Sequence, residues 1–226
     1  MLNTLAKGTN FLLGKILQKK SIFISSTLGY LNRERVIDKN YFDYIRLATL
    51  ELISYEISTK KLIGNTAELG VYKGKFAKYI NQYFPDRSLY LFDTFEGFDN
   101  RDVISETENK FSTGKQDFSD TSVSSVLKLM LFPQKCIPVK GFFPESAKNI
   151  NDHFVFVSLD ADLYEPIYNG LKFFYPKLVS GGYIFIHDFN NDNYKGARKA
   201  VEQFCDEQKI NFLPIPDFGG SAVIIK

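Results

Sequence analysis

Residues 154–166 read F-V-F-V-S-L-D-A-D-L-Y-E-P and join an apolar run to two acids, Asp160 and Asp162. An apolar run without alternation is typical of a strand covered on both faces, as the strands of parallel sheets are. Such strands belong to α/β folds, whose ligands bind beyond the carboxyl ends of the strands. Because both acids follow the run directly, this stretch predicts a fold class and the place of a site.

Strands and helices alternate on both sides of this run. Strands are expected over residues 65–69, 89–92, 136–139, 154–159 and 183–186. Apolar residues at helical spacing separate most of them, over 76–83, 123–131, 167–175 and 196–208. Residues 211–226 read as two short strands around Gly219 and Gly220, a hairpin that would add antiparallel pairing. The pattern predicts an α/β fold with a Rossmann-like doubly wound sheet, mostly parallel, with an antiparallel C-terminal hairpin strand.

The chain is expected to consist of an N-terminal segment, 1–60, and one domain, 61–226. In the first segment, apolar residues at helical spacing lie between lysines around residues 12–17, and a second helix is expected over 41–57. A helical cap or a dimer contact is the favoured interpretation of this segment, and contact with a membrane surface is the alternative. Residues 100–120 are polar and without period, which predicts a long loop.

Composition excludes several classes of protein. The chain has 226 residues, of which 44% are hydrophobic, and this suits one domain with a large core. Its 28 basic and 26 acidic residues give a net charge of +2, so no nucleic-acid partner is expected. Cys136 and Cys205 match no zinc spacing and are too few to staple the fold. Without a membrane span or a secretory signal pattern, we expect a cytoplasmic protein.

The first strand runs into a glycine turn, E-L-G-V-Y-K-G, which places Glu68, Gly70 and Gly74 in the spacing E-x-G-x-x-x-G. Gly70 allows a tight turn, and the following helix offers free backbone amides to a ligand. A dinucleotide fingerprint would have glycine in place of Glu68, so the turn favours a ligand without pyrophosphate. S-adenosylmethionine, with its ammonium and carboxylate groups, fits. A glycine turn with only a structural role is the alternative.

The second and third strands also end on candidate ligand-binding residues. Asp93 follows the glycine turn by about 20 residues, where an acid can accept both hydroxyls of a ribose. Capping of a helix is the alternative for this residue. After the third strand, Gly141, Phe142 and Phe143 would lie near an adenine, although core filling is an equally valid role for either phenylalanine.

The fourth and fifth strands are followed by residues of types that bind metal ions. Asp160 and Asp162 follow the fourth, and His187 and Asp188 follow the fifth. Carboxylates suit Mg²⁺, and a hydroxyl bound to such an ion loses its proton more readily. One aspartate could bind the metal while the other acts as a general base. Capping acids at strand ends are the alternative.

Five motifs resemble, in this order, the macrocin O-methyltransferase (TylF-like) family of class I S-adenosylmethionine-dependent sugar O-methyltransferases. They are E-L-G-V-Y-K-G, L-F-D-T-F-E-G-F, V-K-G-F-F, L-D-A-D-L-Y-E-P and G-G-Y-I-F-I-H-D-F. The resemblance runs from about residue 65 to the C-terminus. It implies transfer of a methyl group, with Mg²⁺ present, to a sugar hydroxyl of a saccharide or glycosylated metabolite.

The resemblance also implies residue roles. Asp160, His187 and Asp188 would hold the metal, and Asp162 would be the base beside Asp160. The cofactor-binding positions are Glu68, Gly70, Tyr72, Gly74, Asp93, Thr94, Gly141, Phe142 and Asp160. Residues 100–120 would form a lid over the acceptor, and the N-terminal segment would support a homodimer.

One residue departs from the family pattern, which has two acids where this chain has His187 and Asp188. Imidazole prefers softer ions than Mg²⁺ does, so another divalent cation is equally compatible with the site.

Three other functions are compatible with parts of the sequence. A glycosyltransferase could use D-A-D to hold a metal and a nucleotide sugar, but this leaves the glycine turn and Asp93 without a task. A protein that binds the cofactor without turnover would explain the histidine. A dehydrogenase fits least, because its phosphate fingerprint is missing.

Overall fold

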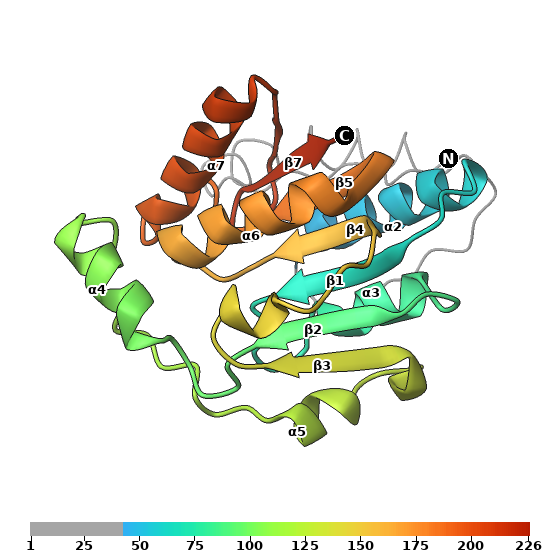
Figure 1. The fold of residues 1–226 in the computed structure, drawn as a ribbon, viewed down its shortest axis with the longest axis horizontal. Helices are drawn as coiled ribbons and strands as arrows, with labels where there is room; N and C mark the ends of the chain where they lie inside the picture. Colours follow the sequence, from blue (N-terminus) through green and yellow to red (C-terminus); the bar gives the residue numbers. More distant parts are fainter. Residues whose placement is uncertain (1–42) are drawn as a thin grey trace, which may run out of the picture. The chain divides into compact units, whose positions relative to one another are not determined.

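The computed structural model describes residues 43–226, and the expected helix around residues 12–17 lies outside them. A seven-stranded sheet in the order β3-β2-β1-β4-β5-β7-β6 runs through the domain (Figure 1). The strands are β1 (Asn65–Leu69), β2 (Leu89–Asp93), β3 (Cys136–Lys140), β4 (Phe154–Leu159), β5 (Leu178–Ile186), β6 (Leu213–Ile215) and β7 (Ser221–Ile225). Strands β1 to β5 are parallel, and β7 is antiparallel to β5 and β6, which confirms the predicted doubly wound sheet and its hairpin.

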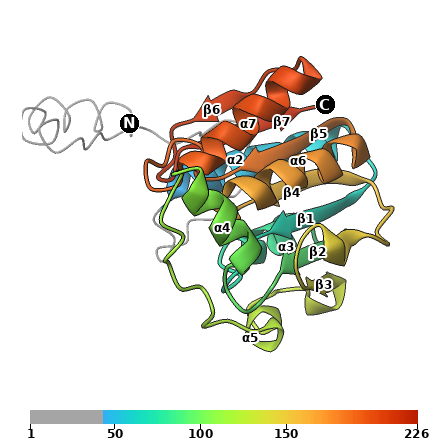
Figure 2. The same ribbon diagram turned by 60° about the vertical axis from the view of Figure 1, so that its left-hand side comes forward.

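Helices cover both faces of this sheet (Figures 1 and 2). The helices are α2 (Tyr44–Thr59), α3 (Ala77–Tyr83), α4 (Asn100–Glu108), α5 (Val123–Leu127), α6 (Tyr164–Lys177) and α7 (Lys195–Gln208), with short 3-10 turns at Pro133–Lys135 and Glu145–Ala147. Helix α2 begins at a side-chain cap, because the backbone N–H of Arg46 donates to Asp43 Oδ1 at 3.2 Å.

Two apolar clusters form the core, one on each face of the sheet. Phe174 of α6 and Phe204 of α7 belong to the cluster on one face, and Leu50 of α2 and Ile80 of α3 belong to the other. Strand β4 lies between the clusters and is buried along its whole length. This explains its apolar run, because each apolar side chain on the strand belongs to one cluster or the other.

Two elements differ from the sequence-based expectation. The loop predicted over residues 100–120 begins with helix α4, which lies beyond the carboxyl ends of the strands (Figure 1). Asp99 caps this helix, and Glu106 on it is buried and accepts a hydrogen bond at 2.9 Å from the N–H of Tyr164 at the start of α6. Strand β5 begins earlier than expected, so Gly181 lies inside it and does not precede it.

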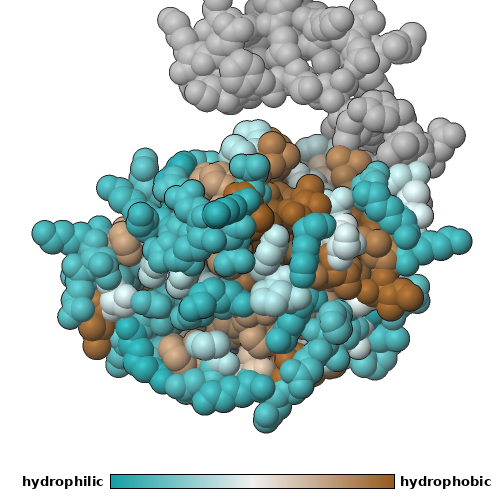
Figure 3. All heavy atoms as spheres, turned by 45° about the horizontal axis from the view of Figure 1, so that its top comes forward, coloured by the Kyte–Doolittle hydropathy of each residue, from teal (hydrophilic) through white to brown (hydrophobic). Residues whose placement is uncertain are grey.

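The surface of the domain includes single exposed apolar side chains. Figure 3 shows one face, on which hydrophobic residues gather in one region beside a largely hydrophilic area. Ile63 and Phe218 are the most exposed large apolar side chains among residues 43–226, at 88% and 80%. Single exposures of this kind are normal on folded proteins. None of the helices in residues 43–226 has the length and apolarity needed to cross a membrane.

Candidate active site

The site lies where the order of the strands reverses, between β1 and β4. From β1 the chain proceeds through β2 and β3 to one edge, and it then returns to β4 on the other side of β1. Backbone hydrogen bonds continue the ladder beyond the strands: Asp160 N–H donates to Leu69 at 2.8 Å, and His187 N–H donates to Leu159 at 2.8 Å. The ends of β1, β4 and β5 therefore open side by side, as expected for a ligand site in a doubly wound sheet.

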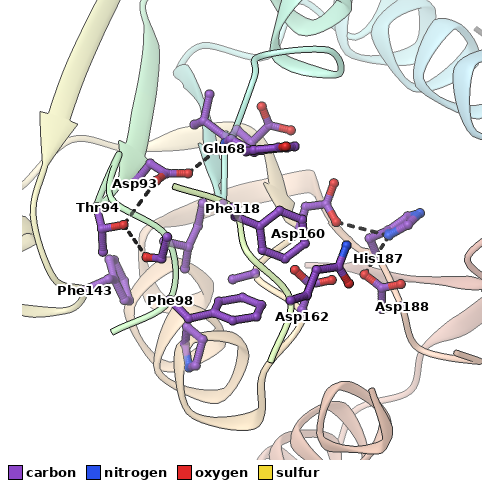
Figure 4. Close-up of a pocket in the computed structure, with 18 of the residues that line it drawn as sticks. Glu68, Asp93, Thr94, Phe98, Phe118, Phe143, Asp160, Asp162, His187 and Asp188 are labelled. Carbon is purple, nitrogen blue, oxygen red and sulfur yellow. Dashed lines mark hydrogen bonds and ion pairs between the residues drawn. The ribbon is translucent and has the colours of Figure 1, made fainter. Parts of the chain in front are cut away.

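A cavity of about 460 Å³ opens at this point (Figure 4). With the exception of Gly74, all the residues that the sequence analysis assigned to the site line it: Glu68, Gly70, Tyr72, Asp93, Thr94, Gly141, Phe142, Asp160, Asp162, His187 and Asp188. Gly74 does not line the cavity, because it packs against Val126, 2.9 Å from where a Cβ on the glycine would lie. Its role is therefore the close approach of α5 to the turn.

The glycine turn and Asp93 are joined by hydrogen bonds. The Tyr72 N–H donates to Asp93 Oδ2 at 2.8 Å, and the Phe95 N–H donates to Oδ1 at 2.6 Å. The hydroxyl of Thr94 donates to the carbonyl of Gly97 at 2.6 Å and so closes the turn after β2. These bonds hold Asp93 at the rim of the cavity, and each of its oxygens keeps a further lone pair for a ligand.

Glu68 is a buried acid with a free acceptor. Its side chain is 1% exposed, and its Oε2 receives no hydrogen bond from the described part of the chain. Burial raises the pKa of Glu68 well above its ordinary value, and the nearby Asp160 carboxylate adds to the rise while Arg46 opposes it. A buried oxygen without a donor is costly, so this position is suited to a ligand that brings a donor or a positive charge.

Aromatic rings form one wall of the cavity. Phe118 contacts Tyr72 and Phe98 edge to face, with ring centroids 4.9 and 5.0 Å apart. Phe142 lies under the guanidinium of Arg101, 3.4 Å from its ring centroid. Phe143 reaches the cavity but is only 5% exposed and belongs to the core. Flat apolar walls of this kind suit an aromatic base.

The acids at the ends of β4 and β5 meet around one histidine. His187 Nδ1 lies 3.1 Å from Asp160 Oδ1 and 2.8 Å from Asp188 Oδ2. Ligand atoms of these three residues all lie within 4.8 Å of one another, so two carboxylates and one imidazole could hold a divalent cation. Asn191 donates to Asp188 Oδ1 at 2.7 Å and orients it.

Charges and burial in this cluster shift the pKa values of its members. Burial alone would raise the pKa of Asp160, but the positive charges of Arg46 and His187 hold it well below its ordinary value. Burial opposes a charge on His187, yet the Asp160 carboxylate outweighs it and raises the pKa of the imidazole to about 10. Desolvation, followed by the charges of Asp188 and Asp160, raises the pKa of Asp162 well above its ordinary value.

Two of the acids have unusual backbones. Asp162 has a φ of 59° and Asp188 a φ of 58°, in the left-handed region that few residues other than glycine adopt. Such conformations cost free energy and gather at functional sites, where the surrounding structure holds them. Strand β4 ends at Leu159, and the backbone at Asp162 is left-handed. The alternation of side chains along the strand therefore does not extend to Asp162 and could not predict where its side chain points.

Several lining residues were missed by the sequence analysis. Arg46 comes from α2, and its Nη2 lies 2.9 Å from Asp160 Oδ2 although the two residues are 114 positions apart. The others lie between β2 and α4, on α4, on the segment after it and beyond β5: Phe98, Asp99, Asp102, Gln116, Phe118, Asn193 and Tyr194. Only the polar run 100–120 gave any signal for part of this set.

Asp102 yields a prediction about stability. Burial, together with the charges of Asp99 and Glu165, raises its pKa from 3.8 to about 7. Between these two values the unfolded chain releases a proton that the folded protein keeps, so folded stability falls as the pH rises through this window. Asp102→Asn cannot ionise, and it should raise the melting temperature by roughly 2–4 °C at pH 8. Scanning calorimetry at pH 8 and pH 4 measures this difference.

The pH dependence is the control for this prediction. Near pH 4 most of the gain from Asp102→Asn should vanish, because the folded wild-type carboxyl is then protonated and neutral, and the unfolded carboxyl is only partly ionised. Asp206→Asn changes an exposed acid on α7 and should leave the melting temperature within about 1 °C at both pH values. An equal gain at both pH values would show that the charge of Asp102 is not its cause.

Comparison with known proteins supplies relatives of this fold. The family model for macrocin-O-methyltransferase (TylF) matches residues 40–224. The O-methyltransferase NovP superposes with a TM-score of 0.67 at 19% identity, over 80% of this chain and 79% of that one. The calicheamicin methyltransferase CalS11 gives 0.64 at 19% identity, over 80% and 78%. An apo structure of CalS11, described as a TDP-rhamnose 3'-O-methyltransferase of calicheamicin biosynthesis, gives 0.57 at 18% identity, over 80% and 78%.

These matches differ in what they establish. At such low identity the structural likeness shows the fold, and the family match covers most of the chain. A search of curated proteins found no match.

Proposed function

The chain belongs to the macrocin-O-methyltransferase (TylF) family and is an O-methyltransferase, and from this premise we propose that it methylates a saccharide hydroxyl with S-adenosylmethionine. The observation that carries the proposal is one cavity with two halves. One half has the glycine turn, Asp93 and the unpartnered Glu68 oxygen, and the other has the acids at the ends of β4 and β5. This division suits a cofactor beside an acceptor. It also gives the glycine turn a role in binding the cofactor, whereas a nucleotide-sugar glycosyltransferase would leave the turn without a role.

The cofactor half has groups that fit S-adenosylmethionine. The free oxygen of Glu68 would accept from the ammonium of its amino-acid part, and Asp93 would accept from the ribose hydroxyls. Phe142, with Gly141 before it, would face the adenine. When bound, this cofactor supplies a methyl group on a positively charged sulfur, which makes the methyl open to attack by an oxygen.

The metal half has the composition of a divalent-cation site. Asp160, Asp188 and His187 would hold the ion, either Mg²⁺ or a softer cation. Such an ion supplies positive charge that lowers the pKa of a neighbouring hydroxyl.

Asp162 would accept the proton of the acceptor hydroxyl. It lines the cavity beside Asp160, and its raised pKa makes its carboxylate a stronger base than an ordinary aspartate. Its backbone lies in the left-handed region, a conformation of the kind that gathers at functional sites. The chain would thus position the acceptor oxygen and take its proton, and no covalent enzyme intermediate is needed.

A hydroxylated acceptor suits the remaining wall. Gln116, Asn191, Asn193 and Tyr194 line the cavity, and their side chains can donate and accept hydrogen bonds. CalS11, one of the structures with this fold, is described as acting on TDP-rhamnose. Residues 109–121, which follow α4, would close over such an acceptor.

Calorimetric titration with S-adenosylhomocysteine, with and without Mg²⁺, tests the proposal. Binding at micromolar concentration supports the cofactor assignment and directs a screen of saccharide acceptors. No binding, together with binding of UDP-sugars, would overturn it in favour of a glycosyltransferase. Cofactor binding without turnover of any acceptor and without metal dependence would favour a non-catalytic binding protein.

Glu68→Gln tests the cofactor half separately. Glutamine has the size of glutamate but lacks its charge, so S-adenosylhomocysteine should bind roughly 10- to 100-fold more weakly, as expected for loss of a charged hydrogen bond. The titration above measures this change. Glu56→Gln, at a solvent-exposed position of α2, should leave the affinity within about twofold. An unchanged affinity in Glu68→Gln would show that this acid does not contact the ligand.

A further inference from the structure

Arg46 brings a permanent positive charge to the acids of the site. Its guanidinium lies 2.9 Å from Asp160 Oδ2, and its side chain is 7% exposed. The guanidinium carbon lies 3.8 Å from the ring centroid of Phe76 and 6.0 Å from that of Phe185. Arginine stays protonated in proteins, so this charge is present at every pH of interest.

The packing around Arg46 leaves it little freedom to withdraw. The cap at Asp43 fixes the first turn of α2, from which the side chain extends. The planar guanidinium rests on Phe76, and a stacked, desolvated cation is favourable only in a narrow geometry. The position of the charge is therefore set by α2 and by the aromatic core as well as by Asp160.

Asp160 has both oxygens engaged by donors. Oδ2 faces Arg46, and Oδ1 lies 3.1 Å from His187 Nδ1. A divalent cation at Asp160 would bind the carboxylate that already faces the guanidinium, either at Oδ1 or at Oδ2 beside the Arg46 contact. It would also be placed near a like charge in a partly desolvated site, where repulsion is stronger than in water.

We propose that Arg46 is an internal counter-ion of Asp160 that competes with a divalent cation and keeps metal binding weak. The acids at the ends of β4 and β5 would then be held in place by the chain itself when no metal is bound. This inference deepens the proposed function, on which it rests for the metal site. Arg46 acts through Asp160 and is a positioning residue.

Arg46→Met removes the charge while its thioether can still pack on Phe76. Manganese binding is measured by calorimetry and by the electron paramagnetic resonance signal of free Mn²⁺. We expect Mn²⁺ to bind roughly tenfold more tightly, or better, to Arg46→Met than to wild type, because the positive charge that repels the ion and already neutralises Asp160 is gone. Arg46→Gln, which is also neutral but can still donate to Asp160, is the second variant in case methionine prevents folding.

Two further variants separate charge from shape. Arg46→Lys keeps the positive charge, so its Mn²⁺ affinity should remain nearer to that of wild type than to that of the neutral variants. Lys75→Met removes from the rim of the same cavity an exposed charge that makes no ion pair with Asp160. Mn²⁺ affinity should change by less than about threefold.

The outcomes distinguish this inference from the proposed function. S-adenosylhomocysteine is titrated into each variant as well. If it binds but the neutral variants gain less than about fivefold in Mn²⁺ affinity, or bind no Mn²⁺ at all, the competition proposed for Arg46 is overturned. An equal gain in Arg46→Lys would overturn it too, because charge would not be the cause. If S-adenosylhomocysteine binds to none of the proteins, wild type included, the proposed function fails, whatever the Mn²⁺ result.

Discussion

Asp160→Asn is expected to lower kcat by about a hundredfold to a thousandfold, the loss typical of removing one charged group from a reacting centre. Asp160 carries the carboxylate on which Arg46 and His187 converge, and it lies beside Asp162, the proposed base. Asparagine keeps the shape but removes the charge. The affinity for S-adenosylhomocysteine should stay within about threefold, because the backbone of Asp160 and the whole glycine turn are unchanged. Single-turnover kinetics with an accepted saccharide and calorimetry measure the two quantities.

The control for this variant is the same substitution at an exposed aspartate far from the reacting centre. Asp206→Asn, at an exposed position of α7, should leave kcat within about twofold. Urea denaturation should accompany the assay, because Asp160→Asn leaves the buried charge of Arg46 facing a neutral partner and this costs stability. Wild-type turnover in a folded Asp160→Asn variant would remove Asp160 from the reacting centre.

Gly70→Ala is expected to destabilise the domain by more than about 4 kcal/mol, a loss that only clashes and other specific defects produce. A Cβ at this position would lie 2.1 Å from the backbone oxygen of Asp160 and 2.6 Å from its carbonyl carbon. Backbone atoms of a neighbouring strand cannot move aside as a side chain can. The approach of β1 to β4 therefore requires glycine, independently of any ligand. Soluble yield and the urea midpoint measure the loss.

Gly97→Ala is a matched control, because its φ of +88° is nearly that of Gly70, +86°. A Cβ at Gly97 would be 3.3 Å from the nearest atom, Ser119 N, so this variant tests the backbone conformation with much less crowding. It should cost only about 1–2 kcal/mol, the penalty of a left-handed residue with a side chain. Equal losses in the two variants would mean that conformation, and not the clash with Asp160, sets the requirement at Gly70.

The parts of the site on strand ends could be predicted from the sequence. Asp93 ends β2, Asp160 and Asp188 follow β4 and β5, and Glu68 is the next-to-last residue of β1. The carboxyl ends of parallel strands share one edge of the sheet. Their meeting in one cavity is thus a consequence of strand pattern alone. Helix α4 was not predictable in this way, because its sequence has no apolar period. It is held by the cap at Asp99 and by the contact between Glu106 and α6.

Local patterns were enough to predict the doubly wound sheet, its hairpin and the strand-end acids, because periodicity and turn residues act locally. The packing of the folded chain was needed to show that Arg46, which looks like an ordinary polar residue of a helix, reaches Asp160 across 114 positions. The same packing gives Gly74 a role in helix packing and places His187 between two carboxylates. Contacts between distant segments depend on how the helices pack against the sheet, and a local pattern contains no information about that packing.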